Sequence, residues 1–159
     1  MSITLGIDPG TATTGYGFVR QHRDTSLEAI AYGVISTPAK TPPAERLAQI
    51  YEELNELILL HRPQQCAVEK LFFQRNVTTA IAVGQARGVI LLALAQAGMS
   101  PAEYTPNEIK LAVSGYGSAG KRQVQEMVRM MLGLQEPPRP DDAADALAVA
   151  ITHIHTHRY

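Results

Sequence analysis

The stretch from Leu5 to Gly10, with the sequence LGIDPG, constrains the fold of this chain more than any other. Ile3, Leu5 and Ile7 alternate with small or polar residues before Pro-Gly ends the run, which is the pattern of a strand followed by a turn. Asp8 is the last side chain before that turn, where a carboxylate is costly unless it has a partner. Asp-Pro-Gly is also favourable turn chemistry by itself, so this stretch alone leaves open whether Asp8 has a chemical role.

Length and composition predict one globular domain spanning residues 1–159. Hydrophobic residues make up 45% of the 159 and charged residues 18%, which is ordinary for a protein with a packed core. We find no uninterrupted apolar run of the roughly 18 residues that a membrane-spanning helix needs, and no signal-peptide pattern at the N-terminus. Cys66 is the only cysteine, so no internal disulfide can form. These features predict a cytoplasmic protein with no membrane partner.

The charge distribution singles out the middle of the chain. The net charge is −1, but residues 70–139 hold eight basic and four acidic residues, a net of +4. Such a segment is a candidate contact for a polyanion such as nucleic acid, while an ordinary solvated surface is the alternative explanation.

Hydrophobic periodicity predicts an α/β fold. We expect strands at about residues 3–7, 16–20, 27–36, 65–71 and 103–104, and helices at about 43–61, 77–97, 106–113, 121–132 and 141–155. The short connections among the first three strands indicate an antiparallel meander, and the later alternation of helix and strand indicates parallel pairing. The expected architecture is a five-stranded mixed sheet with helices on both faces.

Three further acids follow the pattern of Asp8. Glu69 also ends an apolar strand, and the first and fourth strands of a mixed sheet can be neighbours. Asp142 and Asp145 lie three residues apart at the start of an Ala-rich helix and therefore share a face, whereas Asp141 after Pro140 is a natural N-cap. Four carboxylates at the border of a core would repel one another unless cations lie among them, and oxygen ligands suit Mg²⁺ or Mn²⁺. Two such ions about 4 Å apart can activate water for phosphodiester hydrolysis.

These residues carry a resemblance to a known family. The motifs are Gly6-Ile7-Asp8-Pro9-Gly10, Thr14-Gly15-Tyr16-Gly17, Val68-Glu69, Gly84-Gln85-Ala86-Arg87-Gly88, Gly117-Ser118-Ala119 with Lys121, Asp142-Ala143-Ala144-Asp145-Ala146-Leu147-Ala148 and Ala150-Ile151-Thr152-His153. In this order and spacing the chain resembles the RuvC-type crossover junction endodeoxyribonucleases, the bacterial Holliday junction resolvases.

The resemblance implies a ribonuclease H-like fold and a homodimer that cuts four-way junction DNA by paired, symmetric nicks in strands of like polarity, leaving 5′-phosphates. It implies an active site of Asp8, Glu69, Asp142 and Asp145 around Mg²⁺, with two ions per site and Mn²⁺ as a substitute. It also implies that the protein acts together with the RuvA and RuvB branch-migration complex in recombination and repair. The DNA-binding residues that correspond to the family pattern, together with their basic neighbours, are Phe72, Arg75, Lys110, Lys121 and Arg122.

Other functions remain to be distinguished. The segment from Gly115 to Arg122 approaches a phosphate-binding P-loop, but Arg122 replaces the required hydroxyl, and a DNA phosphate is the better ligand for this loop. The stretch from Asp8 to Thr11 also resembles the phosphate turn of an actin-like nucleotide-binding domain. A related ribonuclease H-like nuclease acting on RNA shares the same first strand and turn.

Overall fold

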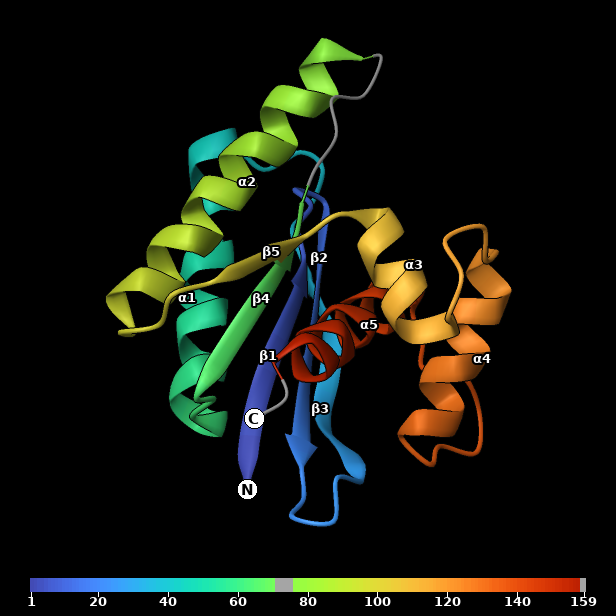
Figure 1. Cartoon of the computed structure of the whole chain (residues 1–159). Helices are drawn as coiled ribbons and strands as arrows, with labels where there is room; N and C mark the ends of the chain where they lie inside the picture. Colours follow the sequence, from blue (N-terminus) through green and yellow to red (C-terminus); the bar gives the residue numbers. More distant parts are fainter. Residues whose placement is uncertain (71–75, 158–159) are drawn as a thin grey trace.

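Five strands form a single mixed sheet in the computed structural model, which describes residues 1–70 and 76–157 (Figure 1). The strands are β1 (Ser2–Asp8), β2 (Thr13–Gln21), β3 (Leu27–Ser36), β4 (Gln65–Glu69) and β5 (Ala102–Tyr104), in the order β3-β2-β1-β4-β5. β2 pairs antiparallel with both β1 and β3, whereas β4 runs parallel to both β1 and β5. The predicted meander and the predicted pairing of the first and fourth strands are confirmed.

The start of β2 differs from the prediction. The strand begins at Thr13 rather than Tyr16, and Gly15 pairs directly with Asp8. Threonine suits a pleated, half-buried surface, and pairing with β1 draws this small-residue segment into the sheet. The turn is confined to residues 9–12, where the Thr14 hydroxyl donates to the Gly10 carbonyl oxygen at 2.5 Å.

Helices cover both faces of the sheet, as predicted (Figure 1). They are α1 (Pro43–His61), α2 (Val77–Gln96), α3 (Pro106–Ser114), α4 (Lys121–Met131) and α5 (Asp141–Thr156). α1 and α2 share one hydrophobic cluster with Leu5, Ile7 and Phe18 of the sheet. α5 packs on the opposite face, and α3 and α4 pack against α5.

α5 lies unusually close to the sheet because two glycines face it. A Cβ atom at Gly6 would overlap the Ala146 carbonyl oxygen, and one at Gly15 would overlap the carbonyl oxygen of Asp142. Absence of a side chain at these positions lets the helix backbone reach β1 and β2. The first turn of α5 is thereby brought next to the end of β1.

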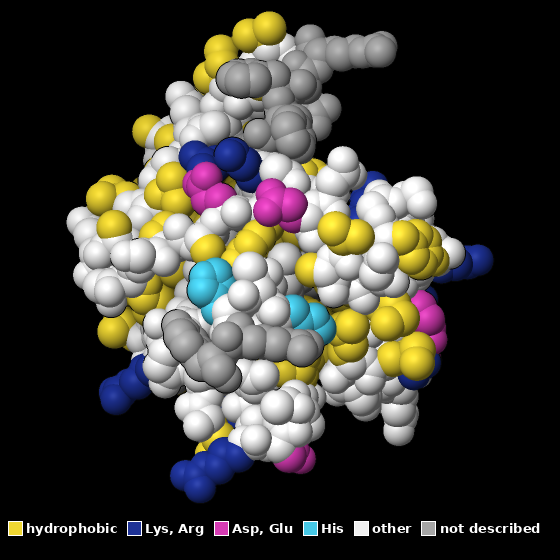
Figure 2. Space-filling view, viewed as in Figure 1, with side chains coloured by type: hydrophobic (Ala, Val, Ile, Leu, Met, Phe, Trp, Pro, Cys, Tyr) yellow, Lys and Arg dark blue, Asp and Glu magenta, His cyan; other side chains and the backbone are white. Residues whose placement is uncertain are grey.

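α2 is largely apolar, and the rest of the molecule covers only part of its surface. Among the described residues, α2 is the one helix that is long enough and apolar enough to cross a membrane, judged by length and composition alone. Of the window tested, 22% is buried inside the molecule. Because Gln85 and Arg87 interrupt it, α2 is not an uninterrupted apolar run, and a single helix of this kind is weak evidence of a membrane span. In the space-filling view, hydrophobic side chains gather on the exposed end of α2 (Figure 2).

Candidate active site

Strand alternation directs Asp8 and Glu69 to the same face of the sheet. Successive side chains of a strand point to opposite faces. Ile7 and Val68 are paired across β1 and β4 and belong to the cluster beneath α1 and α2. Asp8 and Glu69, one residue further along each strand, therefore face α5, and parallel pairing brings them to the same edge of the sheet.

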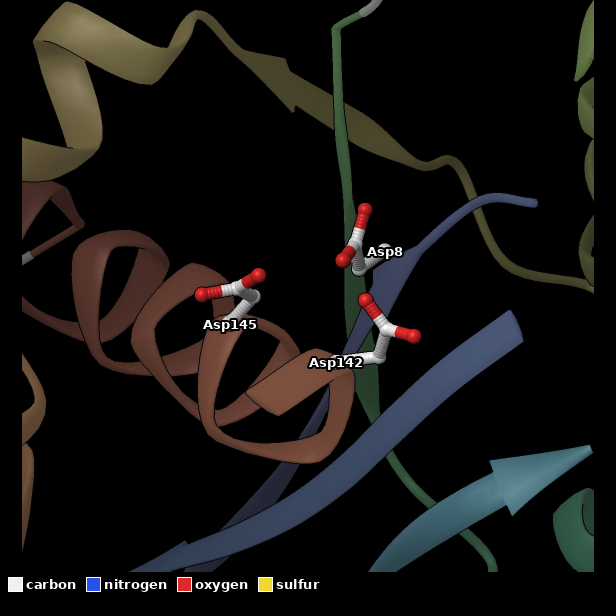
Figure 3. A group of neighbouring side chains, drawn as sticks. All are labelled: Asp8, Asp142 and Asp145. Carbon is white, nitrogen blue, oxygen red and sulfur yellow. The ribbon is translucent and has the colours of Figure 1, made fainter. Parts of the chain in front are cut away.

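Asp142 and Asp145, from the first two turns of α5, complete the group. Each of Asp8, Asp142 and Asp145 offers a carboxylate oxygen, and these three oxygens all lie within 4.8 Å of one another (Figure 3). The three carboxylates come from the first strand and the last helix, and their spacing is suited to a shared metal ion. Glu69 lies outside this set of three but is within hydrogen-bond reach of Asp8.

Burial makes this group electrostatically unfavourable without a cation. Removal from water, followed by repulsion from and hydrogen bonding to Glu69, raises the pKa of Asp8 to about 9. Burial also raises the pKa of Glu69 and that of Asp145, while the Lys121 ammonium opposes both shifts. A divalent cation would remove the repulsion that one lysine only reduces.

Lys121 connects the start of α4 to the acids on α5. Its Nζ lies 3.6 Å from Asp141 Oδ2 and 3.7 Å from Asp145 Oδ2. The Gln125 amide donates to Asp141 Oδ1 at 3.1 Å. The predicted N-cap role of Asp141 is wrong: Pro140 is the N-cap residue, Asp141 is the first helical residue, and its carboxylate binds two side chains of α4. Capture by α4 could not be inferred from the local sequence.

The other predicted DNA contacts divide between two grooves. Lys110 and Lys121 line a groove of about 270 Å³ that also contains Glu69 and Asp145. Arg122 lines a separate groove that reaches Asp142. Phe72 and Arg75, which were also predicted to contact DNA, lie outside the described residues.

The glycine-rich segment before α4 is a helix–helix connection. Gly115 ends α3 in the left-handed conformation, with φ 91°, and Gly120 precedes α4. A P-loop requires a strand leading into the loop, and here a helix does so instead. The structure thus supports the interpretation that this segment is not a nucleotide-binding P-loop.

Sequence reasoning missed the part that glycine plays in building the site. Gly15 allows the first turn of α5, which carries Asp142, to approach Asp8. The available signal was the occurrence of small residues at alternate positions, Gly15 and Gly17, on one face of a strand. That pattern indicates a surface against which another backbone packs closely.

Sequence similarity to known proteins covers nearly the whole chain. Residues 4–153 match the family described as crossover junction endodeoxyribonuclease RuvC. A protein of that name from Heliobacterium modesticaldum is 57% identical over 154 residues, covering 97% of this chain and 94% of its own. A protein of the same name from Chloroflexus aurantiacus is 59% identical over 152 residues, and the match covers 96% of this chain and 92% of that protein.

Solved structures agree with the sequence matches. The chain is similar to T. thermophilus RuvC in complex with Holliday junction substrate, with a TM-score of 0.93, 38% identity, and coverage of 98% of this chain and 94% of that one. The yeast mitochondrial Holliday junction resolvase Ydc2 shares the fold, with a TM-score of 0.72 at 14% identity over 96% of this chain and 77% of that one. On both grounds the expected ribonuclease H-like fold is confirmed, and the chain belongs to the RuvC family of crossover junction endodeoxyribonucleases.

Proposed function

We propose that this chain, as one nuclease domain of residues 1–159, resolves Holliday junctions with Asp8, Glu69, Asp142 and Asp145 as its metal-binding residues. The observation that carries the assignment is the convergence of carboxylate oxygens from β1 and α5 within 4.8 Å, with Glu69 beside Asp8. The family supplies the reaction class, a structure-specific endodeoxyribonuclease. The acidic cluster supplies the place where the phosphodiester bond is cut.

The residues present fit Mg²⁺, with Mn²⁺ as a substitute. The donors are all carboxylate oxygens, which hard divalent cations prefer, and burial leaves them without enough positive charge from the protein. Bound divalent ions, two per site, would activate water and stabilise the leaving oxygen. Asp8 lies near Glu69 and near the two acids of α5, and it would be one of the ligands that hold the metal.

The basic side chains beside the cluster hold the DNA. Lys110 and Lys121 share the groove that contains Glu69 and Asp145. Lysine ammonium groups at this distance from the acids can bind phosphates on either side of the bond that is cut. Attack of water on the phosphorus, with the 3′-oxygen as the leaving group, leaves a 5′-phosphate and a 3′-hydroxyl.

The function is tested with a labelled four-way DNA junction in Mg²⁺. We expect paired, symmetric nicks in strands of like polarity, abolished in both Asp8→Asn and Asp145→Asn. Junction binding by Asp145→Asn should persist, because phosphate contacts dominate the affinity. An RNA duplex serves as competitor: preferential cleavage of RNA, or full activity in Asp8→Asn, would contradict the proposal.

Paired nicking requires two active sites, and we propose a homodimer formed through α2. One stripe of this helix combines exposed apolar side chains with two glycines at which an added Cβ would meet no other part of the molecule within 4 Å. Its members are Val77, Ile81, Gly84, Gly88 and Leu92. They recur at intervals of three and four residues and so share one face, where a second helix can approach closely. The proposed setting is the cytoplasm, with the RuvA and RuvB branch-migration complex as partner.

A further inference from the structure

The groove that contains Arg122 is distinct from the one that contains the two lysines. It has a volume of about 1080 Å³ and runs between α4 and the proline-rich segment before α5. Its walls are Arg122, Gln125, Glu126, Pro137, Pro138, Arg139, Pro140, Asp141 and Asp142. Proline fixes φ, so one wall is stiff and keeps its shape without a bound ligand.

Two of the three acids of this groove, Glu126 and Asp141, already have partners, whereas its two arginines form no ion pair among the described residues. Glu126 accepts from Arg129, with the Nε–Oε1 distance at 2.9 Å. Asp141 is held by Lys121 and Gln125. Arg122 and Arg139 are both exposed, and neither forms an ion pair with any carboxylate of residues 1–70 and 76–157.

The groove also ends at the proposed site of cleavage. Asp142, one of its lining residues, is a proposed metal ligand, and a metal ion would neutralise it. Arg139 lies three residues before Asp142, so their Cα atoms are within about 11 Å. Arginine donors fit phosphate oxygens in a bidentate way.

We propose that this groove binds the DNA backbone next to the cut bond, with Arg139 and Arg122 contacting its phosphates. The inference rests on the proposed function and extends it. The cut strand would pass from the groove of Lys110 and Lys121, across the acidic cluster, and into the groove of the two arginines. Arg139 is the last residue of the basic segment 70–139, but no motif of the sequence marks it as a DNA contact.

Junction binding as a function of salt tests the contact. All variants carry Asp145→Asn to prevent cleavage, and binding is measured in Mg²⁺. We expect Arg139→Gln to weaken binding about five- to tenfold. The slope of log affinity against log salt should become shallower by about 0.7–0.9, the value of one lost phosphate contact. Arg139→Lys, which keeps the charge, should restore the slope.

Arg23→Gln is the matched control. Arg23 is exposed in the β2–β3 turn, at the end of the sheet opposite Asp8, because Gln21 pairs with Ser2 whereas Gly15 pairs with Asp8. Arg23→Gln makes the same change of charge. The affinity of this variant for the junction, and its dependence on salt, should equal those of the parent. Thermal unfolding of each variant separates loss of a contact from loss of fold.

A neutral methylphosphonate placed singly near the cut bond identifies the phosphate. At the contacted phosphate, the losses of affinity caused by the methylphosphonate and by Arg139→Gln should not add, because each change removes the same interaction. Additive effects at every position, or an Arg139→Gln slope equal to that of Arg23→Gln, would overturn the inference. If the parent protein with Asp145 intact fails to cut four-way junctions at all, the proposed function itself fails instead.

Discussion

Asp8 is the residue in which the chemistry of the site and the stability of the fold conflict. Its carboxyl ends a strand, faces α5 and lies among three other acids. Burial raises its pKa to about 9, so the folded state keeps a proton that the unfolded chain loses above about pH 4. The native state binds more protons, and stability from this group therefore falls as pH rises from about 4 to 9.

The Asp8→Asn variant separates the two effects. In metal-free buffer at pH 8 we expect it to unfold at a higher temperature than the parent, because an amide is neutral in both states whereas the Asp8 carboxyl must take up a proton on folding. Addition of Mg²⁺ should raise the melting temperature of the parent, by ligand linkage, and that of the variant much less. Differential scanning calorimetry measures both. A parent whose melting temperature ignores Mg²⁺ would contradict a metal site at Asp8.

His153 is a buried ionisable residue away from the acidic cluster. Its Nδ1 lies 2.9 Å from the Tyr104 hydroxyl, and burial, followed by the nearby His157, lowers its pKa to about 4. A neutral imidazole accepts from Tyr104 in this position. Between pH 6.5 and about 4 the unfolded chain takes up a proton that the folded chain excludes, so stability falls as pH falls.

That loss is at most about 3 kcal/mol at pH 4, since one pKa unit is worth about 1.4 kcal/mol. Urea unfolding at pH 7.5 and pH 5 measures part of it. His153→Asn keeps an acceptor near the Nδ1 position but does not titrate, so its pH dependence should be weaker than that of the parent. His155→Asn makes the same substitution at a histidine of α5 with no side-chain hydrogen bond or ion pair among the described residues, and it should leave the difference unchanged.

At the scale of elements, α5 and the two strands beneath it determine the site. Gly15→Ala would place a methyl group against the Asp142 carbonyl oxygen and push the first turn of α5 away from Asp8. We expect a loss of about 1–3 kcal/mol in stability and a weaker response to Mg²⁺.

Gly117→Ala is the matched control for that variant. A Cβ there meets nothing within 4 Å, so stability and the Mg²⁺ response should remain those of the parent. Equal behaviour of the two variants in calorimetry would mean that close packing of α5 on β2 does not hold the acids in place.

Predictions for the elements succeeded where periodicity was strong. The strand ending at Asp8, the helix from Pro43 to His61 and the helix from Val77 were all predicted within a residue or two. The start of β2 was missed because residues 13–15 are as typical of turns as of strands, and pairing with β1 decides between them. Asp141 was misjudged for a similar reason: its partners lie on α4, far away in the sequence.

At the scale of the whole molecule, the four acids were predictable individually, but their meeting depended on topology. The sequence indicates that Asp8 and Glu69 end strands and that Asp142 and Asp145 share a helix face. That this helix packs on the same face of the sheet follows from the glycines opposite it and from strand alternation. Exact distances among the carboxylates come only from the folded structure.

The dimer prediction also belongs to this scale. Gly84→Trp would insert a large ring into the proposed α2 contact, where the protein alone leaves open space. We expect sedimentation equilibrium to show a mass shifted toward the monomer. Leu59→Trp, at a position 75% exposed on α1, should leave the mass unchanged. Equal masses for both variants would place the contact elsewhere.

The proposed cutting centre takes one carboxylate from the first strand and two from the last helix. During synthesis Asp142 and Asp145 leave the ribosome more than 130 residues after Asp8. A ribosome-bound or prematurely terminated chain would lack half of its metal ligands, however well its N-terminal sheet had formed. With these four acids as the ligands, a chain could cut DNA only after α5 had packed on the sheet and brought Asp142 and Asp145 to Asp8.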